Sequence, residues 1–328
     1  MRSRQLKSIL RLCCHFSLAL AICTCCAFAE TKPMLTIDLL SNGLPMDAFQ
    51  RMTFSQCPFQ YRTYRSVQWL DSEHILVAFN TSPSCTQSKV VAKGNLKLII
   101  FDLKGNVLHS TNLPYEAGDG SPERLIDHDG LWIGPGKSVL IEIPSPHLST
   151  LPNSKDRIVV LSDELVPIQE IDTEDAHLWL RGVRDDRSAV LFSVINQDHS
   201  FNREKCILYT GNPLQQTKGC DNTEVDSLNT EYRKTGFYPA PKGYHIDNYP
   251  GDTSDGFRSM IFVSNGSGLC DLWRFTCPKH GRLIVFETAS KRVLIDRNFP
   301  FDGRARLSPD GKHLAIFEKN SLEILSLP

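Results

Sequence analysis

Several common functional signatures are missing from this chain of 328 residues. After residue 29, no apolar run reaches the roughly 20 residues that a membrane-spanning helix needs. No run of lysine or arginine marks a nucleic-acid surface. The chain has no G-x-S-x-G, H-E-x-x-H or P-loop motif, and no C-x-x-C follows residue 29. We therefore expect no nucleic-acid partner, no metal site, no cofactor and none of the common hydrolase sites.

The first 29 residues have the pattern of a secretory signal peptide. An apolar stretch, FSLALAICTCCAF, leads to the small-x-small sequence Ala27-Phe28-Ala29. The basic residues that precede this stretch are Arg2, Arg4, Lys7 and Arg11. We predict cleavage before Glu30 and export to a periplasm or to the secretory route, with one domain over 30–328. An uncleaved membrane anchor is the alternative. The mature chain would hold 32 basic and 37 acidic residues, a formal charge of −5.

Cysteine usage agrees with an oxidising compartment. Five of the eleven cysteines fall in the predicted signal peptide, and an even number remains. An even count in an exported protein predicts three disulfides, although six cysteines allow 15 connectivities. Pairing of sequence neighbours is the simplest solution. It gives the bridges Cys57–Cys85, Cys206–Cys220 and Cys270–Cys277.

A strand-turn-strand pattern recurs five times along the chain. The C-terminal copy, RLSPDGKHLAIF, has relatives at 69–79, 132–143, 183–194 and 254–263. The position just after each turn holds Glu73, Lys137, Arg187, Arg258 and Lys312. Each copy is followed by a second pair of apolar segments joined by turn residues, such as Gly105-Asn106 and Gly211-Asn212. Each repeat therefore predicts four strands, A to D.

Four-stranded repeats in radial array are typical of a β-propeller. We predict an all-β propeller with five four-stranded blades; a degenerate sixth would have to lie within 205–250. The last repeat ends after its C strand, and MLTIDLL (34–40) is a strand without a repeat. These two ends are expected to pair and close the ring, which leaves no open edge there. Two packed sandwiches or an open sheet are the alternatives.

The segment LSPDGKHLAI (307–316) resembles the repeat of TolB-like and related WD-type propellers. That resemblance covers about ten residues and is weaker in the other copies. It implies the propeller fold and a frequent role in periplasmic binding. It brings no catalytic residue to this chain.

The A–B and C–D turns are short, whereas the B–C and D–A connections are long. Long loops on a rigid scaffold often carry binding residues. Two of these loops combine aromatic and basic residues, the types that often dominate binding energy. We predict a ligand-binding patch from Trp273, Arg274, Phe275, Arg233, Phe237 and Tyr238. The alternative is that Trp273 and Phe275 belong to the core of their own blade.

A second candidate site lies on A strands, whose side chains can face the central channel of a propeller. Arg181, His245 and Asp247 fall on two of these predicted strands. They are expected either to form a polar structural channel or to serve catalysis, an option that rests on fold analogy. The sequence favours an exported non-catalytic protein that binds a protein or a cell-envelope polymer through its long loops. The alternative function is a carbohydrate-active hydrolase or lyase at the channel mouth.

Overall fold

The computed structural model describes residues 32–46, 65–81, 92–117, 131–143, 157–172, 178–184, 186–195, 201–220, 241–254, 258–264, 281–300 and 303–328. All but the first of these residues belong to one compact unit, Pro33–Pro328. The secondary structure of the described residues consists of twenty β-strands and one 3₁₀ turn, Pro135–Lys137. No helix in this part of the chain is long and apolar enough to cross a membrane.

The strands form five four-stranded antiparallel sheets, and four of these follow the chain directly. The first sheet holds β2 (Arg65–Trp69), β3 (His74–Asn80), β4 (Ala92–Asp102) and β5 (Val107–Ala117). The second holds β6 (Leu131–Ile133), β7 (Val139–Ile143), β8 (Arg157–Leu161) and β9 (Pro167–Asp172). The third holds β10 (Leu178–Val183), β11 (Ala189–Ile195), β12 (Phe201–Thr210) and β13 (Gln215–Cys220). The fourth holds β14 (His245–Ser254), β15 (Arg258–Ser264), β16 (Gly281–Glu287) and β17 (Val293–Phe299).

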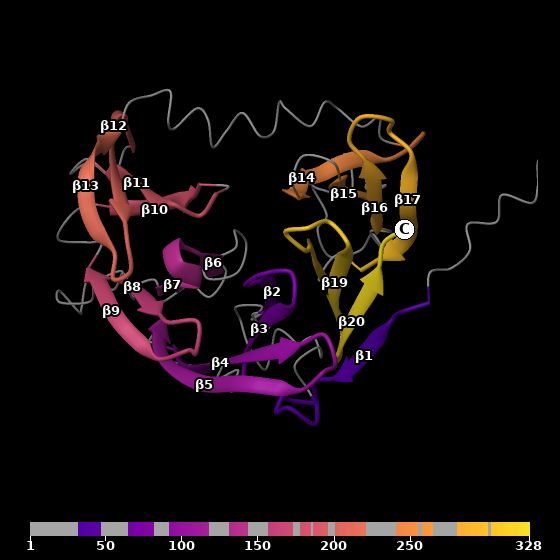
Figure 1. The fold of residues 1–328 in the computed structure, drawn as a ribbon, viewed down its shortest axis with the longest axis horizontal. Helices are drawn as coiled ribbons and strands as arrows, with labels where there is room; N and C mark the ends of the chain where they lie inside the picture. Colours follow the sequence, from indigo (N-terminus) through magenta and orange to yellow (C-terminus); the bar gives the residue numbers. More distant parts are fainter. Residues whose placement is uncertain are drawn as a thin grey trace, which may run out of the picture. The chain divides into compact units, whose positions relative to one another are not determined.

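The fifth sheet combines both ends of the described chain. It holds β18 (Arg304–Leu307), β19 (His313–Glu318), β20 (Ser321–Ser326) and β1 (Leu35–Asp38). Figure 1 shows the indigo strand β1 beside the yellow strand β20, and the register pairs Leu35 with Ile324. The predicted closure by the N-terminal strand is confirmed.

Side-chain alternation explains why the second strand of each sheet is mostly apolar. In β3, the residues Ile75, Val77 and Phe79 pack into a cluster shared with the fifth sheet. The intervening Leu76 and Ala78 pack into a cluster shared with the second sheet. Successive side chains of a strand point to opposite faces of the sheet, so a strand that lies between two other sheets needs apolar residues at every position. The core is therefore distributed between the sheets.

Contacts between sheets link the first strand of each sheet with the first strand of at least one neighbouring sheet. β2 contacts β18 and β19 of the fifth sheet and β6 of the second, β6 contacts β10, and β14 contacts β18. First strands that meet one another, with the later strands of each sheet farther out, are the arrangement of propeller blades (Figure 1). The protein is thus an all-β propeller with five four-stranded blades, as the repeats predict.

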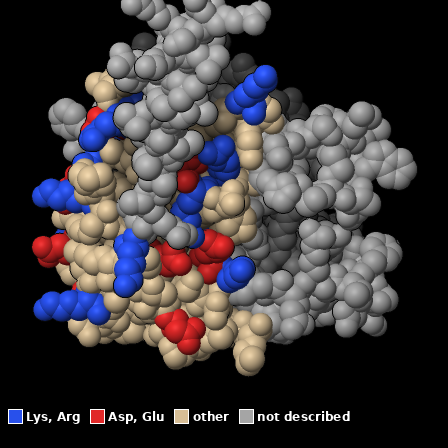
Figure 2. Space-filling model, turned by 90° about the vertical axis from the view of Figure 1, so that its right-hand side faces the viewer, with Lys and Arg blue, Asp and Glu red and all other residues tan. Residues whose placement is uncertain are grey.

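The outer strands of the fourth and fifth blades carry ion pairs. Arg297 of β17 contacts Glu318 and Glu323 of the fifth blade, with N–O distances of 3.3 and 2.8 Å. Arg282 pairs with Asp296 inside the fourth blade. Figure 2 shows the side of the molecule on which β17 and β1 lie in Figure 1, and there acidic and basic side chains are intermixed. The described residues on this face therefore form no extended field of a single sign.

Candidate functional site

Strand direction sorts the connections of the propeller into two ends. The A–B and C–D turns lie at one end, which we call the short-turn end, and the segments between their strands are three to five residues long. The B–C and D–A segments lie at the opposite end, called the long-loop end. Six of these exceed ten residues: 39–64, 81–91, 118–130, 144–156, 221–244 and 265–280. The predicted difference in connection length between the two ends is therefore present in the structure.

The predicted binding residues belong to two of these six segments. Trp273, Arg274 and Phe275 fall within 265–280, and Arg233, Phe237 and Tyr238 fall within 221–240. All six lie outside the described residues. The strands that hold the two segments are described, and their ends are neighbours: His245 is the partner of Ser264, and Ser264 is the partner of Gly281. Both segments are therefore attached to the same end of the fourth blade.

The candidate channel residues lie on first strands of adjacent blades. Arg181 is in β10 of the third blade, and His245 and Asp247 are in β14 of the fourth. For these three residues the structure describes the backbone. Their placement on A strands agrees with the sequence, and their role stays a prediction.

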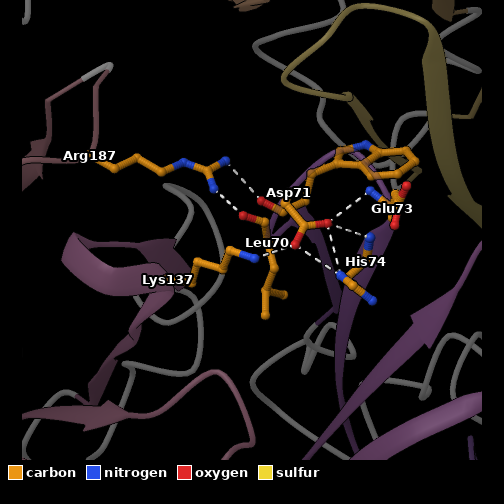
Figure 3. Close-up of polar contacts among 7 residues, drawn as sticks. Leu70, Asp71, Glu73, His74, Lys137 and Arg187 are labelled. Carbon is orange, nitrogen blue, oxygen red and sulfur yellow. Dashed lines mark hydrogen bonds and ion pairs between the residues drawn. The ribbon is translucent and has the colours of Figure 1, made fainter.

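At the short-turn end, the structure brings together residues that the sequence had aligned as one repeat position. Figure 3 shows Asp71 in the first blade, contacted from the second and approached by the third. Lys137 donates from Nζ to Oδ2 of Asp71 at 2.6 Å. Nδ1 of His74 lies 2.9 Å from both carboxylate oxygens. The backbone N–H groups of Glu73 and His74 donate to Oδ1 at 2.8 and 2.9 Å.

This network determines the charge state of Asp71. Its side chain is 24% exposed, and burial by itself raises the pKa of a carboxyl group. The hydrogen bonds from Lys137, His74 and the Glu73 backbone outweigh burial and hold the pKa of Asp71 far below its ordinary value of 3.8. The same contact with Asp71 raises the pKa of Lys137. The pair is therefore ionised across the neutral pH range.

Arg187 extends from the third blade to the first. Its guanidinium donates to the backbone carbonyl of Leu70 and, at 2.9 Å, to that of Trp69 (Figure 3). Arg187 has φ +55°, in the left-handed region that side chains rarely adopt. A residue held in this conformation at a cross-blade contact indicates that the surrounding structure stabilises it.

The backbone corrects the repeat alignment at Arg187. The sequence placed Arg187 with Lys312, as the basic residue after the turn. In the structure, Arg187 donates its N–H to the carbonyl of Arg184, as Gly311 does to that of Ser308. Gly311 has φ +67°, so Arg187 stands where the C-terminal repeat has a glycine. Matching residues by charge shifted this repeat by one position.

The fourth and fifth blades have an analogous contact. Arg258 donates to the backbone carbonyls of Gly311 and Pro328. Between the fifth and first blades, Trp69 donates from Nε1 to the carbonyl of Arg306 at 2.9 Å and stacks on the ring of His313. Three of the four basic residues that the sequence aligned, Lys137, Arg187 and Arg258, thus contact a neighbouring blade. The fourth, Lys312, pairs with Asp310 of its own turn. The sequence contains a signal for these contacts, because the aligned column is basic in four of five repeats, but residue type alone does not identify the partner of each side chain.

The cysteines can be placed in part. Cys206 is 4% exposed and disulfide-bonded, and its Cα partner across the strand pair β12–β13 is Cys220. That register is compatible with the predicted Cys206–Cys220 bridge. Cys57, Cys85, Cys270 and Cys277 lie outside the described residues. Within the described residues, no group of three or more His, Cys, Asp or Glu side chains could hold a metal ion.

Comparisons with known proteins give structural likeness alone. No family model and no curated protein matches this chain. Among solved structures, it is similar to the β-propeller domain of the Trilobed protease from Pyrococcus furiosus, with 11% identity, 80% of this chain and 69% of that chain covered, and a TM-score of 0.28. A DUF4221 family member from Bacteroides vulgatus is 10% identical, with 91% and 98% covered and a TM-score of 0.32. The Dos1 propeller is 8% identical, with 90% and 95% covered and a TM-score of 0.29. The fold assignment rests on the strand topology described above.

Proposed function

We propose that this propeller is an exported, non-catalytic binding protein that holds a protein or a cell-envelope polymer at its long-loop end. The observation that carries the proposal is the difference in length between the two sets of connections. Every segment at the short-turn end has five residues or fewer, while two segments at the other end, 39–64 and 221–244, have 26 and 24 residues. Long loops on a rigid scaffold are where binding residues concentrate.

The chemistry of two adjacent loops supports the same end. Segment 221–244 ends, and segment 265–280 starts and ends, at neighbouring backbone positions of the fourth blade. They supply Trp273, Phe275, Phe237 and Tyr238 with the basic residues Arg233 and Arg274. Aromatic rings with arginine are the usual anchors of a binding surface. The likeness of 307–316 to TolB-like repeats points to a periplasmic binding role as well.

The short-turn end is a poorer candidate for binding. Asp71, Lys137 and Arg187 carry charge there, and each is engaged with a neighbouring blade. A ligand that recruited them would have to replace contacts that hold the first three blades together. This use of charged side chains inside the scaffold leaves the long-loop end as the better site.

The test compares a Trp273→Ala/Arg274→Ala variant with the oxidised mature protein and with a Lys104→Ala/Glu164→Ala control. Lys104 and Glu164 are exposed on C–D turns of the first two blades, at the opposite end. Photo-crosslinking in the exported fraction measures a protein partner, and co-sedimentation with purified envelope polymer measures the other class. We expect the loop variant to bind at least about tenfold more weakly than the parent, as for loss of a central anchor. The control variant should bind as tightly as the parent. Equal binding by all three proteins would contradict the proposal.

A carbohydrate-active hydrolase or lyase is the second candidate. It is favoured by the placement of Arg181, His245 and Asp247 on first strands of adjacent blades. If the parent turned over a member of a polysaccharide panel, and this activity were lost in His245→Ala but kept in Trp273→Ala, the enzyme would replace the binding proposal.

N-terminal sequencing of the exported protein tests the predicted cleavage. The sequence should start at Glu30.

A further inference from the structure

Four of the outer strands contain a β-bulge within their first three residues. At each bulge, one residue has no Cα partner, because the residues on both sides of it pair with consecutive residues of the neighbouring strand. The bulged residues are Leu108 of β5, Ile168 of β9, Thr217 of β13 and Leu294 of β17. A bulge twists an edge strand and re-aims the side chain of its extra residue. The same structural position can therefore be compared between four blades.

The residue at the bulge differs between blades in chemistry and in burial. In the third blade, Thr217 is exposed, and its Oγ1 donates to the Leu208 carbonyl at 3.1 Å. In the fourth blade, Leu294 packs against the apolar cluster that this blade shares with the fifth. In the first and second blades, Leu108 and Ile168 are 42% and 39% exposed. The fold accepts a polar residue at this position, and burial does not account for the two exposed aliphatic side chains.

More apolar side chains are exposed beside these two. Val107 is 48% exposed and precedes Leu108, and Val166 is 54% exposed two residues before Ile168. Met34 is 47% exposed and precedes β1, the outer strand of the fifth blade, which begins beside the end of β20. All five lie where outer strands begin, at the short-turn end of three consecutive blades. Figure 1 shows these strands, β1, β5 and β9, on the periphery of the ring. We call the five residues the apolar rim.

The apolar rim holds most of the exposed apolar side chains of the described residues. It includes five of the six large ones that are exposed there. The A–B and C–D connections of the same three blades are all described, and they leave the rim exposed. The C–D turn of the first blade adjoins β1, because a Cβ added to Gly105 would lie 3.4 Å from the side chain of Leu35. Single exposed apolar residues are ordinary, whereas a group of them marks a surface for contact.

Two features of the chain point to a lipid bilayer as the partner of this surface. The rim consists of aliphatic side chains and one methionine, whereas the hot spots of protein interfaces are enriched in Trp, Tyr and Arg. The chain also enters the propeller here, since Met34 follows the apolar segment 16–28 after the five residues 29–33. Five extended residues span at most about 18 Å. While that segment lies in a membrane, as a signal peptide or as an anchor, the same bilayer is within reach of the rim.

We propose that the apolar rim is a membrane-contact surface, by which the propeller lies on a bilayer with its long-loop end directed away. Apolar side chains that enter the interfacial layer lose their contact with water, and this burial drives adsorption. Each strand runs from one end of the propeller to the other, so the rim and the long loops are at opposite ends. This contact goes beyond the proposed function, which concerns the long-loop end and requires no membrane.

Flotation with lipid vesicles tests the contact without any other partner. The mature chain from Glu30 is mixed with vesicles of phosphatidylcholine and phosphatidylglycerol in equal parts, in low and in high salt. The rim variant Leu108→Thr/Ile168→Thr gives the first two blades the residue type that the third has at this position. The matched control, Gln215→Ala/Gln216→Ala, changes two exposed residues at the start of β13, in a blade outside the rim. Urea unfolding shows whether each variant folds.

The parent should float with the vesicles in both salts, because salt screens charges and not apolar contacts. The rim variant should partition at least about tenfold more weakly, since it loses two aliphatic side chains, and the control should match the parent. Val166→Ser, a substitution directly before β9, should also weaken partition and provides a second test if the double variant does not fold.

Three outcomes would overturn the proposal. The first is that the parent does not bind vesicles, or binds them in low salt alone. The second is that the folded rim variants bind as tightly as the parent. The third is a parent dimer, seen by sedimentation velocity without vesicles, that the rim variant loses; this result would assign the rim to a second copy of the chain.

Discussion

The two ends of the propeller use polar side chains in opposite ways. At the short-turn end, Asp71, Lys137 and Arg187 contact neighbouring turns, so the charges of one blade stabilise another. At the long-loop end, the chain places its longest segments, with aromatic and basic residues of similar chemistry. The charged residues of one end therefore maintain the scaffold, and on the proposed function the other end binds partners. Substitutions at the first end should therefore reduce stability, and those at the second should reduce binding.

The largest expected effect on stability comes from removal of β1, the strand that closes the ring. Deletion of residues 30–42 removes β1, with Ile37 at 8% and Leu39 at 0% exposure. Loss of two buried aliphatic side chains and the β1–β20 pairing should lower the free energy of unfolding by about 3–6 kcal/mol. Denaturant unfolding of the shortened protein measures this effect. Unchanged unfolding would show that closure contributes nothing to the scaffold.

The next largest expected effect on stability comes from loss of the predicted Cys206–Cys220 disulfide in the third blade. Cys206→Ser/Cys220→Ser should lower stability by about 3 kcal/mol, because a bridge that closes a loop of about 15 residues restricts the unfolded chain by that amount. Peptide mapping under non-reducing conditions should first show the pairs 57–85, 206–220 and 270–277. A bridge between different repeats would show that the loop assignments at the long-loop end are wrong.

A smaller expected difference in stability tests the backbone conformation of Arg187. Both Arg187→Ala and Arg187→Gly remove the guanidinium that binds the carbonyls of Trp69 and Leu70. Glycine accepts φ +55° and alanine does not. Arg187→Gly should therefore be more stable than Arg187→Ala by about 1 kcal/mol, in paired denaturant titrations. If alanine were equal or better, the left-handed conformation of Arg187 would not be the native one.

The smallest effect is a pH dependence at Asp71. Because its pKa is lowered in the folded protein, its contribution is present above the ordinary value of 3.8 and is lost as the pH falls toward the folded-state value. Between pH 5 and pH 2, Asp71→Asn should lose less stability than the parent by up to about 1 kcal/mol, since the group is partly exposed. Identical pH profiles would mean that Lys137 and His74 do not stabilise the carboxylate.

Much of the scaffold could be predicted from the sequence because it depends on local patterns. Turn residues and alternating apolar positions predicted the hairpins, and the unpaired segment 34–40 predicted the closing strand. The contact of Arg187 with the first blade could not be predicted, because the distance between turns of different blades follows from the assembled ring. Its equivalence with Gly311 was also hidden, since that equivalence is defined by backbone hydrogen bonds and not by residue type.

The candidate site was less predictable for a related reason. Residue types such as Trp273 and Arg274 indicate a capacity for binding, but sequence alone does not place two loops beside each other. The register of β14, β15 and β16 supplies that placement for the ends of segments 221–244 and 265–280.

The pairing of β1 with β20 also determines the order in which the protein can be completed. Leu35 and Ile324 are partners across almost the whole length of the chain. The strand that is synthesised first is therefore the last that can find its place, and contacts of such long sequence separation form slowly. Until that moment β1 has no partner and β20 presents an open edge, the kind of edge to which strands of other chains can add. Completion of the fifth blade is thus expected to be the last step of folding. Before that step, its open edge is the part of the chain most exposed to pairing with other copies.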